Sequence, residues 1–211
     1  MTAMERVARC GVVPVIVLED VARAVPTARA LLAGGVDVME ITFRTAAARA
    51  SIAAVVKEVP EMLVGAGTVI SLEHLAQAAA AGAQFIVSPG SDEGVIAACI
   101  AKQLPILPGV VTPSEIMLGL RYGLNVFKFF PAENYGGLKT IKALSGPFPQ
   151  SKFLPTGGIS EKNAADYFAD KCIVAVGGSW MATAEMIKTG DYAGITRKSA
   201  ESVALFKAAR G

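Results

Sequence analysis

Two charged side chains lie within apolar segments of this sequence, where a charge is unusual and is a candidate to do chemistry. Lys128 stands between Phe127 and Phe129 in the segment NVFKFFP, whereas the other lysines lie where a cation can reach solvent. Burial disfavours the charged ammonium group, and a neutral amine can attack a carbonyl carbon and form a Schiff base. The alternative interpretation is a structural lysine at a strand end, extended to solvent or paired with a carboxylate.

The second charged group lies in the segment VDVMEITFR. Side chains alternate along a strand, so Glu40, Thr42 and Arg44 share one face. A catalytic interpretation gives proton transfers to Glu40 and gives Arg44, with its planar guanidinium group, the binding of a substrate carboxylate. A purely structural Glu40–Arg44 ion pair fits the same spacing and stays open at this point.

Small residues end several other apolar segments. Thr68 follows the glycines of GAGTV and Pro89 ends AQFIVSP, although tight turns explain both patterns equally well.

Phe130 shares a strand face with Lys128 and could wall a pocket, while simple packing is the alternative. Backbone N–H groups of glycine-rich turns can bind phosphate at helix N-termini. The segments PTGGIS and VGGSW predict such a site at Thr156, Gly157, Gly158, Gly177, Gly178 and Ser179.

Short apolar runs alternate with longer, alanine-rich segments of helical period, and this alternation indicates which elements must position these residues. We expect eight strands, at 12–18, 36–44, 62–69, 83–88, 104–110, 125–130, 152–157 and 172–178. Helices are expected between them, at 20–35, 46–59, 71–82, 91–103, 112–123 and 160–170.

Eight strand–helix units in this length predict a parallel sheet closed into a (β/α)8 TIM barrel, forming a single domain over residues 1–211. The alternative is a doubly wound open sheet, which would need a GxGxxG fingerprint after its first strand, and PVIVLED contains none. In a barrel the active site lies at the carboxyl ends of the strands. The candidate residues above follow or end such strands.

The composition excludes several classes of protein. The chain is 53% hydrophobic and 18% charged, which argues against disorder, and its longest apolar run, from Cys10 to Leu18, is too short to span a membrane. Arg6 and Arg9 before that run resemble a leader peptide, but its β-branched residues favour a buried strand. A net charge of +2 without any basic block argues against a nucleic-acid partner. Three cysteines without CxxC spacing fit a reducing cytoplasm.

The single histidine limits the chemistry further. His74 lies in the alanine-rich segment SLEHLAQAAAAG, and we interpret it as a residue on the surface of a helix. A metal centre with several histidines cannot be assembled within one chain, and no metal-ligand spacing occurs. We therefore expect chemistry that needs neither a metal nor another cofactor.

Taken together, the motifs VVPVIV, EITFRT, GAGTV, AQFIVSPG, PGVVTPSE, FKFFPAE, PTGGIS and GGSW resemble the 2-keto-3-deoxy-6-phosphogluconate aldolase family. The resemblance covers residues 10–195. It implies a class I (Schiff-base) aldolase on a (β/α)8 barrel, assembled as a homotrimer. The implied substrates are a 2-keto-3-deoxy sugar-acid phosphate and 4-hydroxy-2-oxoglutarate, with pyruvate as the shared product.

The resemblance also implies a role for each candidate residue. Lys128 matches the Schiff-base lysine and Glu40 the general acid and base. Two other functions remain as alternatives: a sugar-phosphate isomerase or epimerase with Glu40 as base, and a non-catalytic sugar-phosphate-binding barrel. Only an aldolase needs a covalent bond between substrate and Lys128. The matching substrate-binding positions are Arg44, Thr68, Pro89 and Phe130, the turn Thr156, Gly157 and Gly158, and the phosphate-side residues Gly178 and Ser179.

Overall fold

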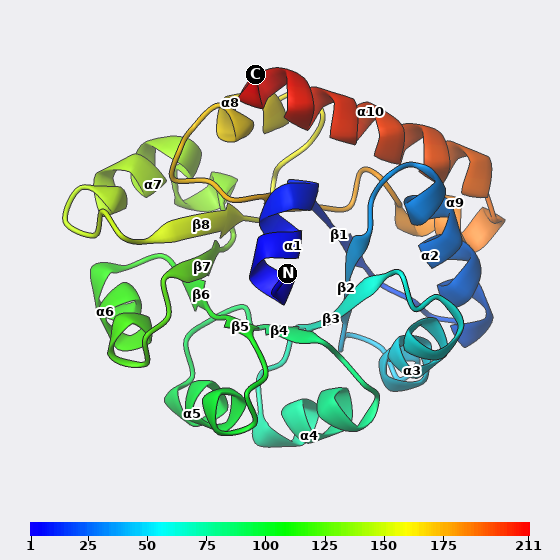
Figure 1. Cartoon of the computed structure of the whole chain (residues 1–211), viewed down its shortest axis with the longest axis horizontal. Coiled ribbons are helices and arrows are strands. Elements are labelled where there is room, and N and C mark those ends of the chain that lie inside the picture. The colour runs from blue at the N-terminus through cyan, green and yellow to red at the C-terminus, as the bar shows by residue number, and fades with distance from the viewer.

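The computed structural model describes residues 1–211 and consists of parallel strands surrounded by helices (Figure 1). Every strand pairing is parallel, which confirms the predicted α/β class. The strands are β1 Val12–Ile16, β2 Val38–Thr42, β3 Leu63–Gly67, β4 Phe85–Val87, β5 Ile106–Leu107, β6 Gly109–Val110, β7 Val126–Phe129, β8 Lys152–Pro155 and β9 Val176–Gly178.

These strands form two hydrogen-bonded sheets rather than one uninterrupted ring. The larger sheet has the order β5-β4-β3-β2-β1-β9, and the smaller has the order β6-β7-β8. Isolated parallel bridges, Phe153 with Ile173 and Thr156 with Gly177, join β8 to the segment that runs into β9. The pairing thus establishes the parallel α/β architecture.

The expected strand 104–110 is divided in two. Pro108 separates β5 from β6, because its ring nitrogen carries no hydrogen to donate to a neighbouring strand. β5 pairs with β4 and β6 pairs with β7, so the two halves belong to different sheets. This break lies beside the Lys128 strand, since Gly109 is aligned with Lys128.

The helices lie outside the strands, apart from α1, which lies over the centre of the molecule in Figure 1. Polar caps explain where several begin: Thr112 and Glu115 form a capping box before α6, with Pro113 in the first turn. The helices are α1 Ala3–Cys10, α2 Ala24–Ala33, α3 Ala48–Glu58, α4 Leu72–Ala80, α5 Glu93–Ala101, α6 Pro113–Arg121, α7 Gly137–Ser145, α8 Ala164–Phe168, α9 Ala184–Thr189 and α10 Tyr192–Arg210, with 3-10 turns η1 Val21–Arg23 and η2 Glu133–Tyr135.

The structure differs from the sequence expectations in several helices. The expected helix 160–170 is shortened to α8, because residues 160–163 form a turn in which the Asn163 side chain accepts the Ser160 N–H. The helices α1, α7, α9 and α10 carried no sequence assignment. Of these, α10 packs against α2, where a Cβ on Gly34 would lie 2.4 Å from the Cβ of Ser199.

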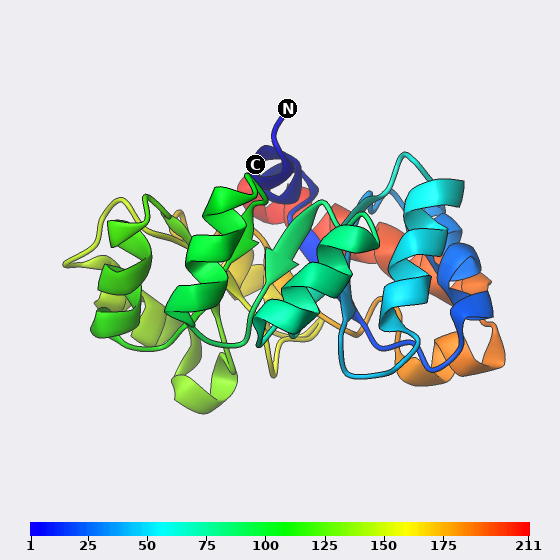
Figure 2. The same ribbon diagram turned by 90° about the horizontal axis from the view of Figure 1, so that it is seen from below.

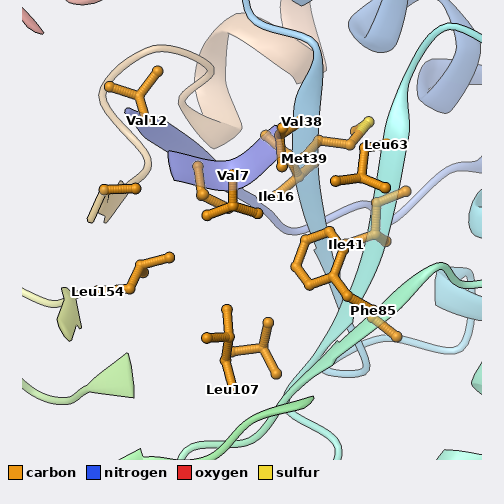
Figure 3. Packing of buried hydrophobic residues seen from close by; sticks show 14 of the residues in the cluster. Val7, Val12, Ile16, Val38, Met39, Ile41, Leu63, Phe85, Leu107 and Leu154 are labelled. Carbon is orange, nitrogen blue, oxygen red and sulfur yellow. The ribbon is translucent and has the colours of Figure 1, made fainter. Parts of the chain in front are cut away.

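The core lies on both sides of the strands, between them and the outer helices and also in the centre beneath α1 (Figure 3). Figure 3 shows Val7 of α1 among buried side chains that come from β1, β2 and β3, such as Ile16, Val38 and Leu63. The two termini lie at the same end of the molecule, next to α1 (Figure 2). Since α1 leads directly into the start of β1, this is the end at which the strands begin. No helix combines the length and apolar character needed to cross a membrane.

Candidate active site

Lys128 and Glu40 form a buried pair between strands of the two sheets. The Nζ of Lys128, on β7, lies 3.4 Å from Oε1 of Glu40, on β2. Lys128 is 3% exposed and Glu40 is fully buried, so both side chains are shielded from solvent. The structural alternative of a Glu40–Arg44 ion pair is wrong, since Glu40 pairs with Lys128 while Arg44 is exposed and forms no salt bridge.

The space for the Glu40 carboxylate is provided by a glycine on the next strand. A Cβ on Gly67, in β3, would lie 2.0 Å from Oε1 of Glu40, so no larger residue fits there without displacing the carboxylate. The second oxygen, Oε2, is buried and has no hydrogen-bond partner. Buried polar atoms are nearly always hydrogen-bonded, so this oxygen is a candidate to contact a reacting molecule.

A cavity of about 390 Å³ adjoins this pair. Val15, which is aligned with Glu40, and Phe130, whose ring centroid lies 5.1 Å from the Lys128 Nζ, both line it. Arg44 is the one charged side chain in the lining, which favours an anionic ligand. The lining consists of Val15, Val17, Arg44, Phe130, Thr156, Gly157, Gly158, Ile159, Gly178, Ser179, Ala182 and Ala184.

One side of the cavity is a glycine turn that follows β8. Gly157 and Gly158 have φ angles of +100° and +77°, a region that L side chains rarely adopt. Thr156 precedes them, and its Oγ1 is buried without a partner, as Glu40 Oε2 is. A Cβ on Gly177 would lie 2.2 Å from that hydroxyl, so Gly177 makes room for Thr156 rather than lining the cavity.

Thr68 and Pro89 lie outside the cavity lining. Pro89 lines a separate hollow of about 300 Å³, while Thr68 directly follows Gly67 and has a φ of +57°, a strained value for a β-branched residue. Both nevertheless lie beside residues that contact the buried pair. A Cβ on Gly109, which is aligned with Lys128, would lie 2.1 Å from the carbonyl oxygen of Pro89.

This arrangement can perform carbonyl chemistry. A buried amine beside a carboxylate can form an imine with a ketone, and the carboxylate can exchange protons with the adduct. The guanidinium of Arg44 and the glycine turn offer binding groups for anions in the same cavity. These features favour a substrate that has a keto group and negative charges.

Comparison with known proteins decides the family. The model of the family described as KDPG and KHG aldolase matches residues 4–198. The KHG/KDPG aldolase of Escherichia coli strain K12 is 50% identical over 203 residues, which are 96% of this chain and 95% of that protein. The chain belongs to the KDPG and KHG aldolase family. KDPG is 2-keto-3-deoxy-6-phosphogluconate, so the comparison confirms the family that the sequence motifs resemble.

Solved structures of this family share the fold. KDPG aldolase from Legionella pneumophila, with pyruvate captured as a covalent carbinolamine intermediate, aligns with a TM-score of 0.91 at 42% identity, covering 95% of this chain and 97% of that one. The KDPG aldolase of Zymomonas mobilis ZM4 with 3-phosphoglycerate aligns with a TM-score of 0.90 at 44% identity, covering 96% of each chain.

Sequence reasoning missed the apolar part of this aldolase-family site. Val15, Val17, Ile159, Ala182 and Ala184 line the cavity, yet nothing in their residue types separates them from the core. Only the alignment of Val15 with Glu40 in neighbouring strands would have indicated one of them.

The single histidine lies away from the buried pair. His74 is half-buried in the first turn of α4, where its ring stacks on Phe43 with centroids 5.3 Å apart. His74 is therefore a partly exposed helix residue, as expected, and it packs against the residue next to Arg44. No group of three or more His, Cys, Asp or Glu side chains is arranged to hold a metal ion.

Proposed function

We propose that this chain is a class I aldolase that cleaves 2-dehydro-3-deoxy-6-phosphogluconate (KDPG) into pyruvate and glyceraldehyde 3-phosphate, and 4-hydroxy-2-oxoglutarate into pyruvate and glyoxylate. The observation that carries the proposal is the buried Lys128–Glu40 pair beside a cavity with one guanidinium group. Membership of the KDPG and KHG aldolase family and the carbinolamine captured in the Legionella relative support the same chemistry.

The reaction begins when the neutral Nζ of Lys128 attacks the C2 carbonyl of the substrate and forms a carbinolamine. Glu40 lies 3.4 Å from that nitrogen, so it can take the proton that the Lys128 ammonium loses before the attack and later deliver it to the departing hydroxyl, which leaves as water. Loss of water leaves a protonated imine between Lys128 and C2. The positive charge on this imine makes C2 able to accept an electron pair.

The positively charged imine allows the C3–C4 bond of the substrate to break. A base takes the proton of the C4 hydroxyl, the C3–C4 bond breaks, and its electron pair moves toward the iminium to form an enamine on Lys128. The C4 part leaves as the aldehyde. Protonation of the enamine at C3 and addition of water to the imine then release pyruvate and restore the amine.

The remaining site residues hold the two ends of the substrate. Arg44 binds the carboxylate next to C2, with Thr68 and Pro89 packed around the pyruvyl part and Phe130 as a wall of the cavity. The phosphate lies at the other end, on backbone N–H groups of the glycine turn. The phosphate-side residues are Thr156, Gly157, Gly158, Gly178 and Ser179.

The proposal includes the architecture in which this site works. The strands form a closed (β/α)8 barrel of a single domain, supported by the parallel bridges between β8 and the β9 segment. The enzyme acts in the cytoplasm as a homotrimer. Large apolar side chains that remain exposed on one chain, Ile70 and Leu72 among them, support such an assembly.

Borohydride reduction in the presence of pyruvate tests the proposed function. Hydride reduces the imine to a stable secondary amine, so mass spectrometry should find a reduced pyruvyl group on the peptide that contains Lys128, together with loss of activity. Lys152→Met, on the neighbouring strand β8, is the matched control and should label as the parent protein does. Turnover of a sugar phosphate without labelling would favour an isomerase, and neither turnover nor labelling would favour a binding protein.

A further inference from the structure

The segment that follows the Lys128 strand lies directly against the Gly157–Gly158 turn of the cavity. The N–H of Ala132 donates to the carbonyl of Thr156 at 2.8 Å, and the N–H of Glu133 donates to the carbonyl of Gly157 at 3.1 Å. A Cβ on Gly158 would lie 2.6 Å from the Cβ of Glu133. The placement of the turn therefore depends on where Glu133 lies.

Glu133 is itself held by a buried tyrosine. Tyr167 of α8 is 2% exposed, and its hydroxyl donates a hydrogen bond to Oε1 of Glu133. Burial, followed by the nearby Glu133 carboxylate, raises the pKa of the Tyr167 hydroxyl, which keeps it protonated as a donor. A Cβ on Gly137 would lie 2.7 Å from this hydroxyl and 2.8 Å from Glu133 Oε1, so the pair is tightly enclosed.

The same short helix holds the turn from a second point. Asn163, the residue before α8, donates from Nδ2 to the carbonyl of Gly158 at 3.2 Å and accepts the N–H of Ser160 at 2.8 Å. The contact to Gly158, like the one through Tyr167 and Glu133, reaches the turn and not the Nζ of Lys128. A loss of the Tyr167 hydroxyl should therefore loosen the turn without disturbing the amine.

We propose that Tyr167 and Glu133 are positioning residues that hold the Gly157–Gly158 turn so that its backbone N–H groups receive the phosphate-bearing end of the substrate. This inference rests on the proposed function. Neither residue lines the cavity, so both act through the turn rather than by touching the substrate. The effect of removing either one should be confined to ligands that carry a phosphate.

The test uses the condensation direction, in which pyruvate and the aldehyde have separate KM values. Tyr167→Phe removes one hydroxyl and should raise the KM for glyceraldehyde 3-phosphate by about 3- to 10-fold, the range expected for a weakened hydrogen bond. The KM for pyruvate, kcat, borohydride labelling with pyruvate, and kcat/KM for unphosphorylated glyceraldehyde should stay within about twofold of the parent values.

Calorimetry with 3-phosphoglycerate gives a second measurement that needs no turnover. Its Kd should rise in Tyr167→Phe by the same factor as the KM for glyceraldehyde 3-phosphate. Tyr122→Phe is the matched control, because Tyr122 also donates to a glutamate, Glu93 Oε1 at 3.0 Å, but on the exposed surface between α5 and α6. That variant should leave every value unchanged.

Changes at Glu133 complete the experiment. Glu133→Gln keeps an acceptor oxygen for Tyr167 and should retain the parent affinity for phosphate, whereas Glu133→Ala should behave as Tyr167→Phe does. The double variant with Glu133→Ala and Tyr167→Phe should bind phosphate-bearing ligands no more weakly than the more impaired of the two single variants. Both substitutions remove the same interaction, so their effects should not add.

Three results would overturn the proposal: no change in Tyr167→Phe, equal losses with phosphorylated and unphosphorylated ligands, or additive losses in the double variant. Failure of the proposed function would look different. In that case the parent protein would not label at Lys128, while the Kd for 3-phosphoglycerate would still report whether Tyr167 positions the turn.

Discussion

Glu40 and Arg44 lie four positions apart in the sequence, yet their surroundings are opposite. Glu40 is fully buried against Lys128, while Arg44 is exposed at the edge of the cavity. A buried carboxylate next to an amine suits proton transfer, and an exposed guanidinium suits the capture of an incoming carboxylate. The two residues should therefore fail in different ways when they are replaced.

Glu40→Gln keeps the size of the side chain and removes the proposed base. We expect kcat to fall by about 10²- to 10⁴-fold while KM changes little, because substrate binding does not need the proton transfer. Steady-state kinetics and thermal unfolding, measured on the same preparation, check this. A variant that unfolds readily but whose folded fraction keeps normal kcat would show that Glu40 only balances the charge of Lys128.

In the proposed function, Arg44→Ala removes a charge-assisted contact to the substrate. Such a contact contributes about 1.5 to 3 kcal/mol, so KM should rise by about 10- to 150-fold with a much smaller change in kcat. Thermal stability should stay near that of the parent protein, since Arg44 is exposed and forms no salt bridge. Unchanged KM values for both substrates would exclude Arg44 from carboxylate binding.

Single residues were predictable where they break a pattern. Lys128 between two phenylalanines and Glu40 in an apolar strand are anomalies that the sequence displays directly. Their mutual contact spans 88 residues of chain, and the space that Gly67 leaves for Glu40 depends on the pairing of β2 with β3. Such contacts depend on the alignment of strands, so no local pattern could have indicated them.

At the scale of elements, polar caps mark the start of three helices that were expected, although α1, α9 and α10 also begin after capping side chains and were not expected. The helices α4, α5 and α6 begin after Ser71, Asp92 and Thr112, whose side chains accept backbone N–H groups, and all three were expected. The 19-residue helix α10 was not, because it spreads its few fully buried residues, Gly194, Ile195, Ser199 and Ser202, without an apolar stripe. One expected strand is divided at Pro108, because proline has no backbone N–H to donate to a neighbouring strand.

Helix α5 gives an element-scale prediction through Cys99. Burial raises the pKa of its thiol to about 11. In the unfolded chain the pKa of a cysteine thiol is about 8.5. Because the folded-state pKa is the higher one, the stability contribution is complete below about pH 8.5 and is lost as the pH rises toward 11. The free energy of unfolding should therefore decline over this range.

Urea unfolding at several pH values checks this prediction. Cys99→Ala should show a shallower decline between pH 8.5 and pH 10.5 than the parent protein does. Cys172, whose pKa burial also raises to about 11, accounts for part of the remaining slope. Equal slopes in parent and variant would show that Cys99 does not contribute to the alkaline loss of stability.

At the scale of the whole molecule, exposed apolar residues bear on the proposed trimer. Ile70 and Leu72 are 57% and 58% exposed and lie two residues apart, next to the hollow that contains Pro89. Met117 is equally exposed at 57% but lies on another element, α6. Two neighbouring apolar side chains beside a hollow are a better candidate for a subunit contact than one isolated side chain.

Light scattering at micromolar concentration tests this assembly. We expect a molar mass about three times the 21.8 kDa of the chain, and a mass near that of one chain would contradict the trimer. Replacing Ile70 and Leu72 together by lysine should shift the distribution toward the monomer, because a subunit contact would then have to bury two unpaired charges. Met117→Lys is the control and should leave the mass unchanged. A trimer that survives the double replacement would place the interface on a different face of the molecule.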